Sequence, residues 1–366
     1  MHILVLGAAG MVGRKLVERL LRDGRLGTSD ITRMTLHDVV APKRPEKAGF
    51  PVETMAGDFA LPGVAEKLIA GRPDVIFHLA AIVSGEAELD FDKGYRINLD
   101  GTRMLFDAIR LVGGGYKPRV VFTSSIAVFG APFPDAIGDE FFNTPLLSYG
   151  TQKAIGELLL ADYSRRGFMD GVGIRLPTIC IRPGLPNKAA SGFFSGILRE
   201  PLAGQEAVLP VSEDVRHWHA SPRSAVGFLV HAATLDAAKV GPRRNLTMPG
   251  ISATVGEQIA ALKRVAGDKV ATRIKRAPDP FIVGIVAGWP RNFNPKRSLE
   301  LGFTTAEKTF DDIIRIHIDD ELGGQFAAYE KMQENDHDGQ HRRLGAYALW
   351  QIRHRDRREP GGQGRQ

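Results

Sequence analysis

The chain has 366 residues, of which 43% are hydrophobic, and a single cysteine, so no internal disulfide can form and a reducing compartment is expected. Residues 341–366 hold seven arginines and two acidic residues, which gives them a net charge of +5 out of the total of +6. Because the positive charge is concentrated in this tail, it does not indicate that the rest of the chain binds nucleic acid. The sequence has no apolar run near ~18 residues and no signal-peptide pattern, so we expect a cytoplasmic protein without a membrane span.

Short apolar runs alternate with amphipathic stretches through the first half of the chain. This alternation is typical of βαβ units and predicts an α/β fold with a doubly wound parallel sheet. Runs such as DVIFHLA and RVVFTSS are almost continuously apolar, as strands buried on both faces should be. We predict strands near 2–7, 32–38, 52–55, 74–79, 118–123 and 171–179, and helices near 11–23, 61–70, 95–112 and 149–166.

A glycine-rich turn joins the first predicted strand to the first helix. Gly7, Gly10 and Gly13 form the pattern G-x-x-G-x-x-G, and Met11 and Val12 lie within it. Glycine permits a tight turn, a close approach of the backbone to a pyrophosphate, and close packing of helix on strand. The helix N-terminus adds free N–H groups and a positive dipole end. We therefore predict that this turn binds the phosphates of a dinucleotide.

Further cofactor contacts are predicted along the next strands. Asp38 ends the second strand, where a carboxylate accepts from a ribose 2′-OH and repels a 2′-phosphate, which favours NAD over NADP. Lys43 and Arg44 lie nearby and offer an alternative site for that phosphate. Asp58, with Phe59, is a candidate for the adenine edge, although a turn-forming aspartate is the competing interpretation. The other expected contacts lie at later strand ends and on one helix: Leu79, Ala80, Ala81, Asn98, Ser124 and Pro177.

Tyr149 and Lys153 are four residues apart in the run SYGTQKAIGELLL, so on a helix they share one face. An ammonium beside a phenol favours the phenolate, and a tyrosine tuned in this way can act as a general base toward an alcohol. Together with the glycine turn, the pair predicts an enzyme that transfers a hydride between an alcohol carbon and a nicotinamide.

The second half of the chain has a different texture. Prolines break it into short pieces after residue 180, but helices are still expected at 221–235, 254–267 and 305–321. Thr254 and Glu257 form a capping box at the start of the second of these helices. We predict a Rossmann-type domain over 1–180, to which some later segments return, and a smaller, irregular substrate lobe over 181–322. The tail 323–366 is interpreted as disordered, as a docked helix around 340–355, or as a sequence artefact.

The motifs GAAGMVG, Asp38, Gly57–Asp58, HLAA, Asn98, TSS at 123–125 and YGTQK at 149–153 occur in this order. Over residues 1–322 the chain resembles the extended short-chain dehydrogenases/reductases of the NAD-dependent epimerase/dehydratase group. The resemblance implies NAD as the cofactor and a homodimer formed through helices 95–112 and 149–166. It also implies roles for five side chains: Tyr149 as acid/base, Lys153 lowering its pKa and holding the nicotinamide ribose, Ser125 bonding the reacting oxygen, Ser124 lining the nicotinamide, and Asn98 bracing the fourth strand.

Departures from the group narrow the expected chemistry. Sugar-nucleotide dehydratases place Thr-Asp-Glu where this chain has Ser125, Ile126 and Ala127, and the last two cannot supply the acid/base pair that an elimination needs. The C-terminal half most resembles the family of D-erythronate dehydrogenases, which oxidise the C2 hydroxyl of a four-carbon sugar acid with NAD+. A small-molecule acid needs a polar or cationic clamp, for which the candidates are Ser84, Ser125, Arg182, Lys188, Ser191 and Arg216.

Alternatives remain open at this level. A nucleotide-sugar 4-epimerase would use the same triad, keep NAD bound, and need cations such as Arg182 and Arg223 for a diphosphate. A non-catalytic NAD-responsive binding protein would not need the triad. His217 and His219 alternate as on a strand, but no nearby set of ligands completes a metal site, so no metal is expected.

Overall fold

The computed structural model describes residues 1–184 and 190–324. The chain divides into a compact unit, residues 1–317, and a second unit, residues 318–366. The predictions for Lys188 and for almost all of the tail therefore fall outside the described residues. Within the described ranges, no helix combines the length and the apolar character needed to cross a bilayer.

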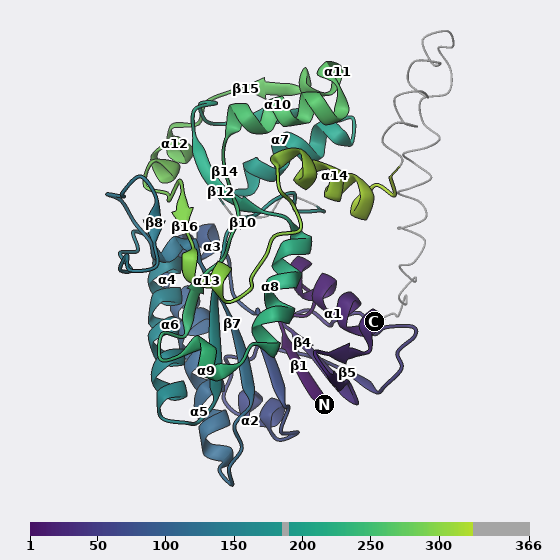
Figure 1. Ribbon diagram of the computed structural model, residues 1–366, viewed down its shortest axis with the longest axis vertical. Helices are drawn as coiled ribbons and strands as arrows, with labels where there is room; N and C mark the ends of the chain where they lie inside the picture. Colours follow the sequence, from purple (N-terminus) through teal and green to yellow (C-terminus); the bar gives the residue numbers. More distant parts are fainter. Residues whose placement is uncertain (185–189, 325–366) are drawn as a thin grey trace, which may run out of the picture. The chain divides into compact units, whose positions relative to one another are not determined.

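A parallel sheet of seven strands forms the centre of the first unit, in the order β13-β9-β7-β6-β1-β4-β5 (Figure 1). The order reverses between β1 and β6, and such a switch point is where Rossmann-type sheets bind their ligand. Five of the six predicted strands are confirmed, the sixth is divided in two, and β13 is added from the C-terminal half. The strands are β1 (His2–Leu6), β4 (Arg33–Asp38), β5 (Val52–Ala56), β6 (Val75–His78), β7 (Arg119–Ser125), β9 (Asp170–Leu176) and β13 (Asn245–Thr247).

The predicted strand 171–179 is two strands. β9 ends at Leu176, and β10 (Thr178–Ile179) pairs with β12 (Arg216–Ala220) in a separate sheet that also contains β14 (Ile251–Thr254). Pro177 lies between the two strands. Because proline has no N–H to donate to a β ladder, it interrupts the strand at this position. The chain therefore leaves the seven-stranded sheet at Pro177 and enters this smaller sheet. The assignment of residues 181–322 as a substrate lobe stays a prediction.

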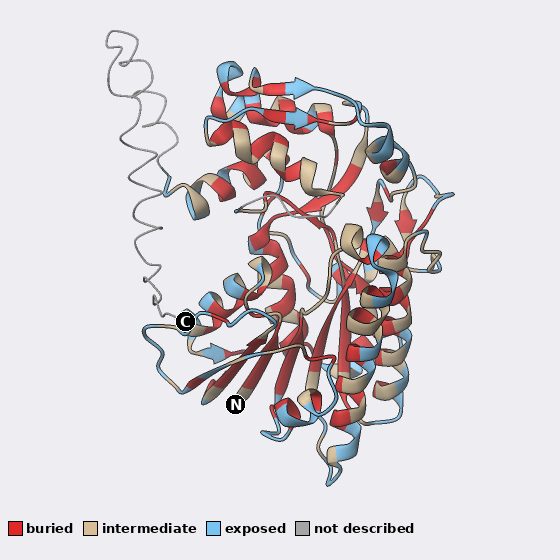
Figure 2. Cartoon of the chain, turned by 180° about the vertical axis from the view of Figure 1, so that it is seen from behind, coloured by how far each residue is buried: buried red, intermediate tan, exposed pale blue. Residues whose placement is uncertain are grey.

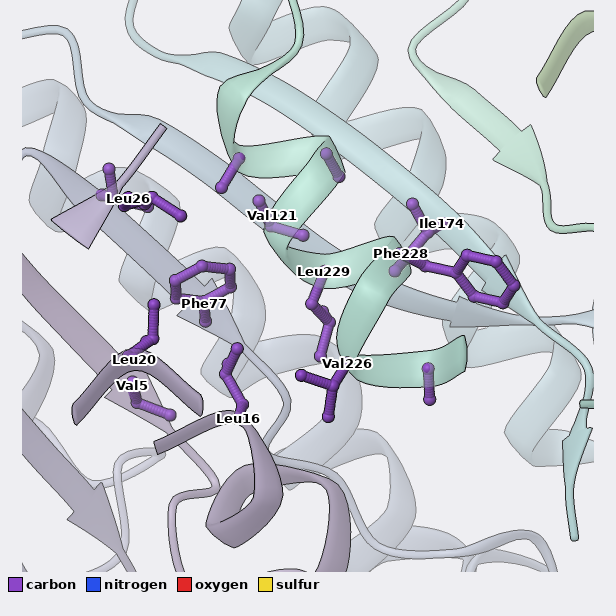
Figure 3. Packing of buried hydrophobic residues seen from close by; sticks show 14 of the residues in the cluster. Val5, Leu16, Leu20, Leu26, Phe77, Val121, Ile174, Val226, Phe228 and Leu229 are labelled. Carbon is purple, nitrogen blue, oxygen red and sulfur yellow. The ribbon is translucent and has the colours of Figure 1, made fainter. Parts of the chain in front are cut away.

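Helices cover both faces of the large sheet. On one face, α1 (Met11–Asp23) and α8 (Pro222–Thr234) pack on strand residues that include Val5 and Phe77 (Figure 3). On the other, Leu4 and Ile76 pack against helices α2 (Val64–Ile69), α5 (Thr102–Val112) and α6 (Ser148–Arg165). Because neighbouring residues on a strand point to opposite faces, both sets must be apolar in the central strands, which are buried along most of their length, whereas the edge strand β5 is largely exposed (Figure 2).

Helix ends follow the local sequence closely. The predicted capping box is confirmed at the start of α10 (Val255–Ala266), where the Thr254 hydroxyl accepts from the Glu257 N–H at 3.0 Å and the Glu257 carboxylate accepts from the Thr254 N–H at 2.7 Å. The predicted helix 95–112 differs in its first part, where η1 (Tyr95–Gly101) is a π-helical turn that leads into α5.

Among the helices of eight residues or more between residues 190 and 324, two were not predicted, α7 (Gly192–Leu202) and α12 (Pro280–Ala287). The predicted final helix 305–321 is shorter, because α14 (Phe310–Glu321) begins at Phe310. The other short elements are β2 (Arg25–Leu26), β3 (Ser29–Asp30), α3 (Ser84–Leu89), α4 (Phe91–Gly94), η2 (Ile126–Val128), β8 (Ile137–Gly138), β11 (Ala207–Leu209), α9 (Ala237–Val240), α11 (Asp268–Ala271), β15 (Ile274–Arg276), β16 (Phe293–Asn294) and α13 (Lys296–Glu300).

Candidate active site

A cavity of about 350 Å³ lies where the carboxyl ends of the central strands meet segments from the second half of the chain. The glycine turn forms one wall, and the start of α6 and the segment after β9 form others. The cavity brings together many of the predicted residues, namely Gly7, Gly10, Met11, Val12, Gly13, Leu79, Ala81, Ser84, Ser124, Ser125, Tyr149, Lys153, Pro177, Arg182 and Ser191.

The glycine turn is built for close approach. Gly7 has φ +87°, and a Cβ there would lie 2.7 Å from the backbone nitrogen of Ala80. A Cβ on Gly13 would lie 2.1 Å from the Gly7 carbonyl oxygen, so both positions require glycine. No side chain caps the first turn of α1, which leaves its N–H groups available to an anion. The turn therefore fits the pyrophosphate of a dinucleotide.

Asp38 lies beside this turn. Its carboxylate accepts a hydrogen bond from the Ala9 N–H at 2.9 Å, which holds it at the end of β4 next to the glycines. One carboxylate oxygen is thus fixed and the other is left to accept from a ribose hydroxyl, as predicted for NAD.

Asp38→Asn should shift coenzyme preference toward NADP+. The amide keeps an oxygen for the Ala9 N–H but removes the negative charge that repels a 2′-phosphate. We expect the ratio of kcat/KM for NAD+ over NADP+ to fall on the order of 10-fold or more. Steady-state kinetics with both coenzymes measures the ratio, with Asp30→Asn on the exposed β3 as the matched control. An unchanged ratio in Asp38→Asn would remove Asp38 from the coenzyme site.

Asp58 and Phe59 do not line the cavity in this structure. Both carboxylate oxygens of Asp58 have protein partners, the Ala60 N–H at 2.9 Å and the Arg96 guanidinium at 2.7 Å. The Phe59 ring is buried, and a Cβ on Gly101 would lie 2.8 Å from it. Their contact with adenine therefore stays a prediction, and the turn-forming role of Asp58 is the one that its contacts support.

Asn98 is buried and braces the segment after β6. Its side-chain oxygen accepts from the Ile82 N–H at 2.9 Å, and its amide donates to the Ile82 carbonyl at 3.2 Å and to Gln152 at 2.8 Å. These bonds hold the wall where Leu79 and Ala81 lie. The Asn98 amide is fully used within the protein, in keeping with the structural role expected for it.

The hydroxyl of Ser124 has a different partner from the expected one. It donates to the buried carboxylate of Glu157 at 2.5 Å, while Ser124 also lines the cavity, so its predicted place beside the nicotinamide stays a prediction. Arg175 donates to both oxygens of Glu157, at 2.8 and 2.7 Å. Sequence analysis missed this buried ion pair, although Glu157 lies four residues after Lys153 on α6.

Arg175→Met should lower the free energy of unfolding by about 3–5 kcal/mol, because the buried Glu157 carboxylate would lose its bidentate partner. Urea denaturation measures the change. Arg165→Met is the matched control: Arg165 pairs with Asp162 on the exposed face of the same helix, and its loss should cost less than about 1 kcal/mol. Equal losses in the two variants would contradict a structural role for the buried pair.

Ser125, Tyr149 and Lys153 meet at the cavity. Ser125 ends β7 and accepts from the Ala127 N–H at 3.1 Å, while Tyr149 and Lys153 lie on the first turns of α6. Gly150 makes this approach possible, because a Cβ there would lie 2.1 Å from the Ala127 carbonyl oxygen. In the sequence, Gly150 was the residue that could have indicated the close approach of α6 to the end of β7.

The predicted tuning of Tyr149 by Lys153 stays a prediction, because other groups influence the pKa of Tyr149 in this structure. Burial raises the pKa of Tyr149 to about 12, and the groups that lower it are the Arg182 charge and a hydrogen bond with Ser125. The Lys153 ammonium instead donates to the Thr123 carbonyl at 2.7 Å and lies 5.7 Å from the centre of the Tyr149 ring. Burial also lowers the pKa of Lys153 to about 7, which weakens its charge near neutral pH.

Arg182 is the cation that faces the reacting groups. Its Nε donates to the Ile179 carbonyl at 3.0 Å, and its Nη2 donates to the Ser191 hydroxyl at 2.8 Å. Among the described residues no carboxylate neutralises it, although it is partly buried. A guanidinium in this state is suited to binding an anion.

Arg216, one of the predicted substrate residues, does not line the cavity. Arg216 is directed away from the cavity, since its guanidinium donates to the Ser252 carbonyl and to Glu257, both at 3.2 Å. It is therefore removed from the candidate clamp.

His217 lines the cavity, and its ring centre lies 5.4 Å from that of His219. The described part of the chain contains no group of three His, Cys, Asp or Glu side chains placed to hold a metal ion.

Comparison with known proteins agrees with this geometry. Residues 3–224 match the model of the NAD dependent epimerase/dehydratase family. The D-erythronate dehydrogenase of Cupriavidus necator is 46% identical over 324 residues, which cover 87% of this chain and 98% of that protein. The D-erythronate dehydrogenase of Haemophilus influenzae is 40% identical over 319 residues, which cover 87% and 99%.

A crystal structure described as the nucleoside-diphosphate-sugar epimerase from Agrobacterium tumefaciens is 68% identical, with a TM-score of 0.87 over 89% of this chain and 96% of that one. The Thermus thermophilus UDP-glucose 4-epimerase in complex with NAD shares the fold at 21% identity, with a TM-score of 0.67 over 86% and 97%. The parallel sheet, the glycine turn at its switch point and these relatives define an NAD-dependent oxidoreductase. The chain belongs to the NAD-dependent epimerase/dehydratase family.

Proposed function

We propose that the protein oxidises the C2 hydroxyl of a small sugar acid, D-erythronate, to 2-dehydro-D-erythronate. One observation carries the proposal: Arg182, a guanidinium without a carboxylate partner among the described residues, lies in the cavity close enough to Tyr149 to lower its pKa. The full-length similarity to two D-erythronate dehydrogenases supports the choice of acid.

Each side chain has a stated task in this proposal. Arg182 and the Ser191 hydroxyl bind the substrate carboxylate and so place C2 beside Tyr149. Tyr149 takes the proton of the C2 hydroxyl, and Ser125 donates a hydrogen bond to the reacting oxygen. The glycine turn and Asp38 hold NAD+, which when bound supplies the hydride acceptor, and Lys153 faces its ribose.

A nucleotide-sugar 4-epimerase is the alternative, and the description of the Agrobacterium structure favours it. Such a substrate brings a diphosphate, which needs several cations. Of the described residues that line the cavity, only Lys153 and Arg182 are cationic, and Lys153 is bonded to Thr123. One available guanidinium fits a carboxylate better than a diphosphate.

We also propose a cytoplasmic homodimer. α5 and α6 expose the large apolar side chains of Leu111 and Leu158, which are 68% and 70% accessible, as a helical dimer contact would require. The only cysteine, Cys180, is a buried thiol, as suits a reducing compartment. Light scattering after size-exclusion chromatography tests the dimer.

NADH absorbance tests the function. NAD+ is mixed with the protein and, separately, with D-erythronate, L-threonate, D-glucuronate and UDP-galactose. Reduction with D-erythronate above the other acids is the expected result. No reduction with any acid, together with conversion of UDP-galactose to UDP-glucose, would overturn the proposal in favour of the epimerase.

A further inference from the structure

His217 and Thr178 form a buried pair on the cavity wall. The Thr178 hydroxyl lies 2.7 Å from His217 Nε2, and His217 Nδ1 lies 2.8 Å from the Pro290 carbonyl oxygen. Both residues line the same cavity as Arg182 and Tyr149, and His217 is 3% exposed. This pair has no role in the mechanism above.

The surroundings fix which atom carries each proton. A carbonyl oxygen can only accept, so His217 Nδ1 must be the N–H that donates to Pro290. Burial lowers the pKa of His217 to about 4, so the ring is neutral near pH 7 and Nε2 is an acceptor. The Thr178 hydroxyl must then donate its single proton to Nε2.

The ring cannot easily turn to change this arrangement. His217 stacks on Phe194 with ring centres 5.2 Å apart and planes at 4°, and Trp289 lies 5.2 Å away. The Thr178 oxygen is thereby left with lone pairs only. It is an acceptor in a cavity that Arg182 and Ser191, which carry donors, also line.

We propose that Thr178, oriented by His217, accepts a hydrogen bond from a hydroxyl of the substrate beyond C2 and so selects polyhydroxy acids over their deoxy analogues. The inference rests on the proposed function and specifies its substrate class. A substrate that has hydrogen in place of that hydroxyl would leave the buried Thr178 oxygen without a hydrogen-bond donor, which costs free energy on binding.

The test compares D-erythronate with its 3,4-dideoxy analogue, 2-hydroxybutanoate of the same C2 configuration. Thr178→Val should lower the ratio of kcat/KM for D-erythronate over 2-hydroxybutanoate about 10-fold or more, since one buried acceptor is lost. Thr178→Ser keeps the hydroxyl and should keep most of the selectivity. His217→Phe keeps the stacking on Phe194 but frees the Thr178 proton, so its ratio should fall as well.

A binding measurement separates selectivity from turnover. Calorimetric titration of both acids into Tyr149→Phe with NAD+, with and without Thr178→Val, should show the same loss of preference. A ratio that stays at the wild-type value in Thr178→Val, or that falls equally in Thr178→Ser, overturns this inference alone. A wild-type protein that reduces NAD+ with neither acid overturns the proposed function, and the inference with it.

Discussion

Tyr149→Phe is expected to lower kcat for NAD+ reduction by roughly 10²–10⁴-fold, the usual contribution of a positioned general base. The phenol is half-buried in the cavity at the first turn of α6, beside Ser125 and Arg182, and phenylalanine fills the same space without an atom that can accept a proton. Stopped-flow or steady-state NADH absorbance with D-erythronate measures the loss.

The control for this variant is coenzyme binding, which calorimetry with NAD+ should find nearly unchanged. The pH profile gives a second readout. Burial holds the pKa of Tyr149 at about 12. As long as the pH is below this pKa, each increase of one pH unit raises the phenolate fraction tenfold, so kcat/KM of the wild type should increase from pH 7 to 10. Tyr149→Phe should lose this rise. Retention of more than a tenth of the wild-type kcat would show that Tyr149 is not the base.

Arg182→Leu is expected to lower kcat/KM for D-erythronate by about 2–4 kcal/mol, or roughly 30- to 1000-fold, because the substrate carboxylate would enter the cavity without a countercharge. The loss should appear largely in KM, since the guanidinium binds a group that does not react. Removing the positive charge also removes one of the two influences that lower the pKa of Tyr149, so kcat near neutral pH should fall as well.

Two comparisons make this second result specific to the carboxylate. Arg182→Lys keeps the charge but not the bidentate fork and should lie between the wild type and Arg182→Leu. The uncharged amide of D-erythronate should be a poor substrate for the wild type and should lose much less than the acid on Arg182→Leu. An equal loss for acid and amide would indicate that Arg182 supports only the local fold, through Ile179 and Ser191.

The sequence was sufficient where structure is locally determined. Helix α1 begins and ends at the predicted residues 11 and 23, because a glycine turn opens it and Gly24, at φ +65°, closes it. The sequence was not sufficient to predict which way the side chains at the end of a strand point. Ser124 and Ser125 are neighbours on β7, so their side chains must point to opposite faces, but a strand buried on both faces gives no polar signal to say which hydroxyl bonds to Glu157 and which accepts from the Ala127 N–H.

The same limit applies to long-range partners. Arg182 and Arg216 looked equivalent as carboxylate clamps, yet Arg216 pairs with Glu257, 41 positions later, once β12 and β14 lie side by side. The orientation of Thr178 likewise depends on Pro290 through His217, and no local pattern relates these residues. Such choices follow from tertiary contacts, which spacing in a single sequence does not encode.

The way in which β13 completes the sheet has a consequence for engineering. The seven-stranded sheet and its helices are not built from one contiguous stretch of chain, because one of the two edge strands, 245–247, and one covering helix, 222–234, come after the chain has left the sheet at Pro177. A fragment cut near residue 180 would have an unpaired edge along β9 and a bare apolar face over Val121 and Ile174. Substrate preference is therefore better altered by single substitutions within residues 181–322 than by exchanging everything after residue 180 for the corresponding part of a relative.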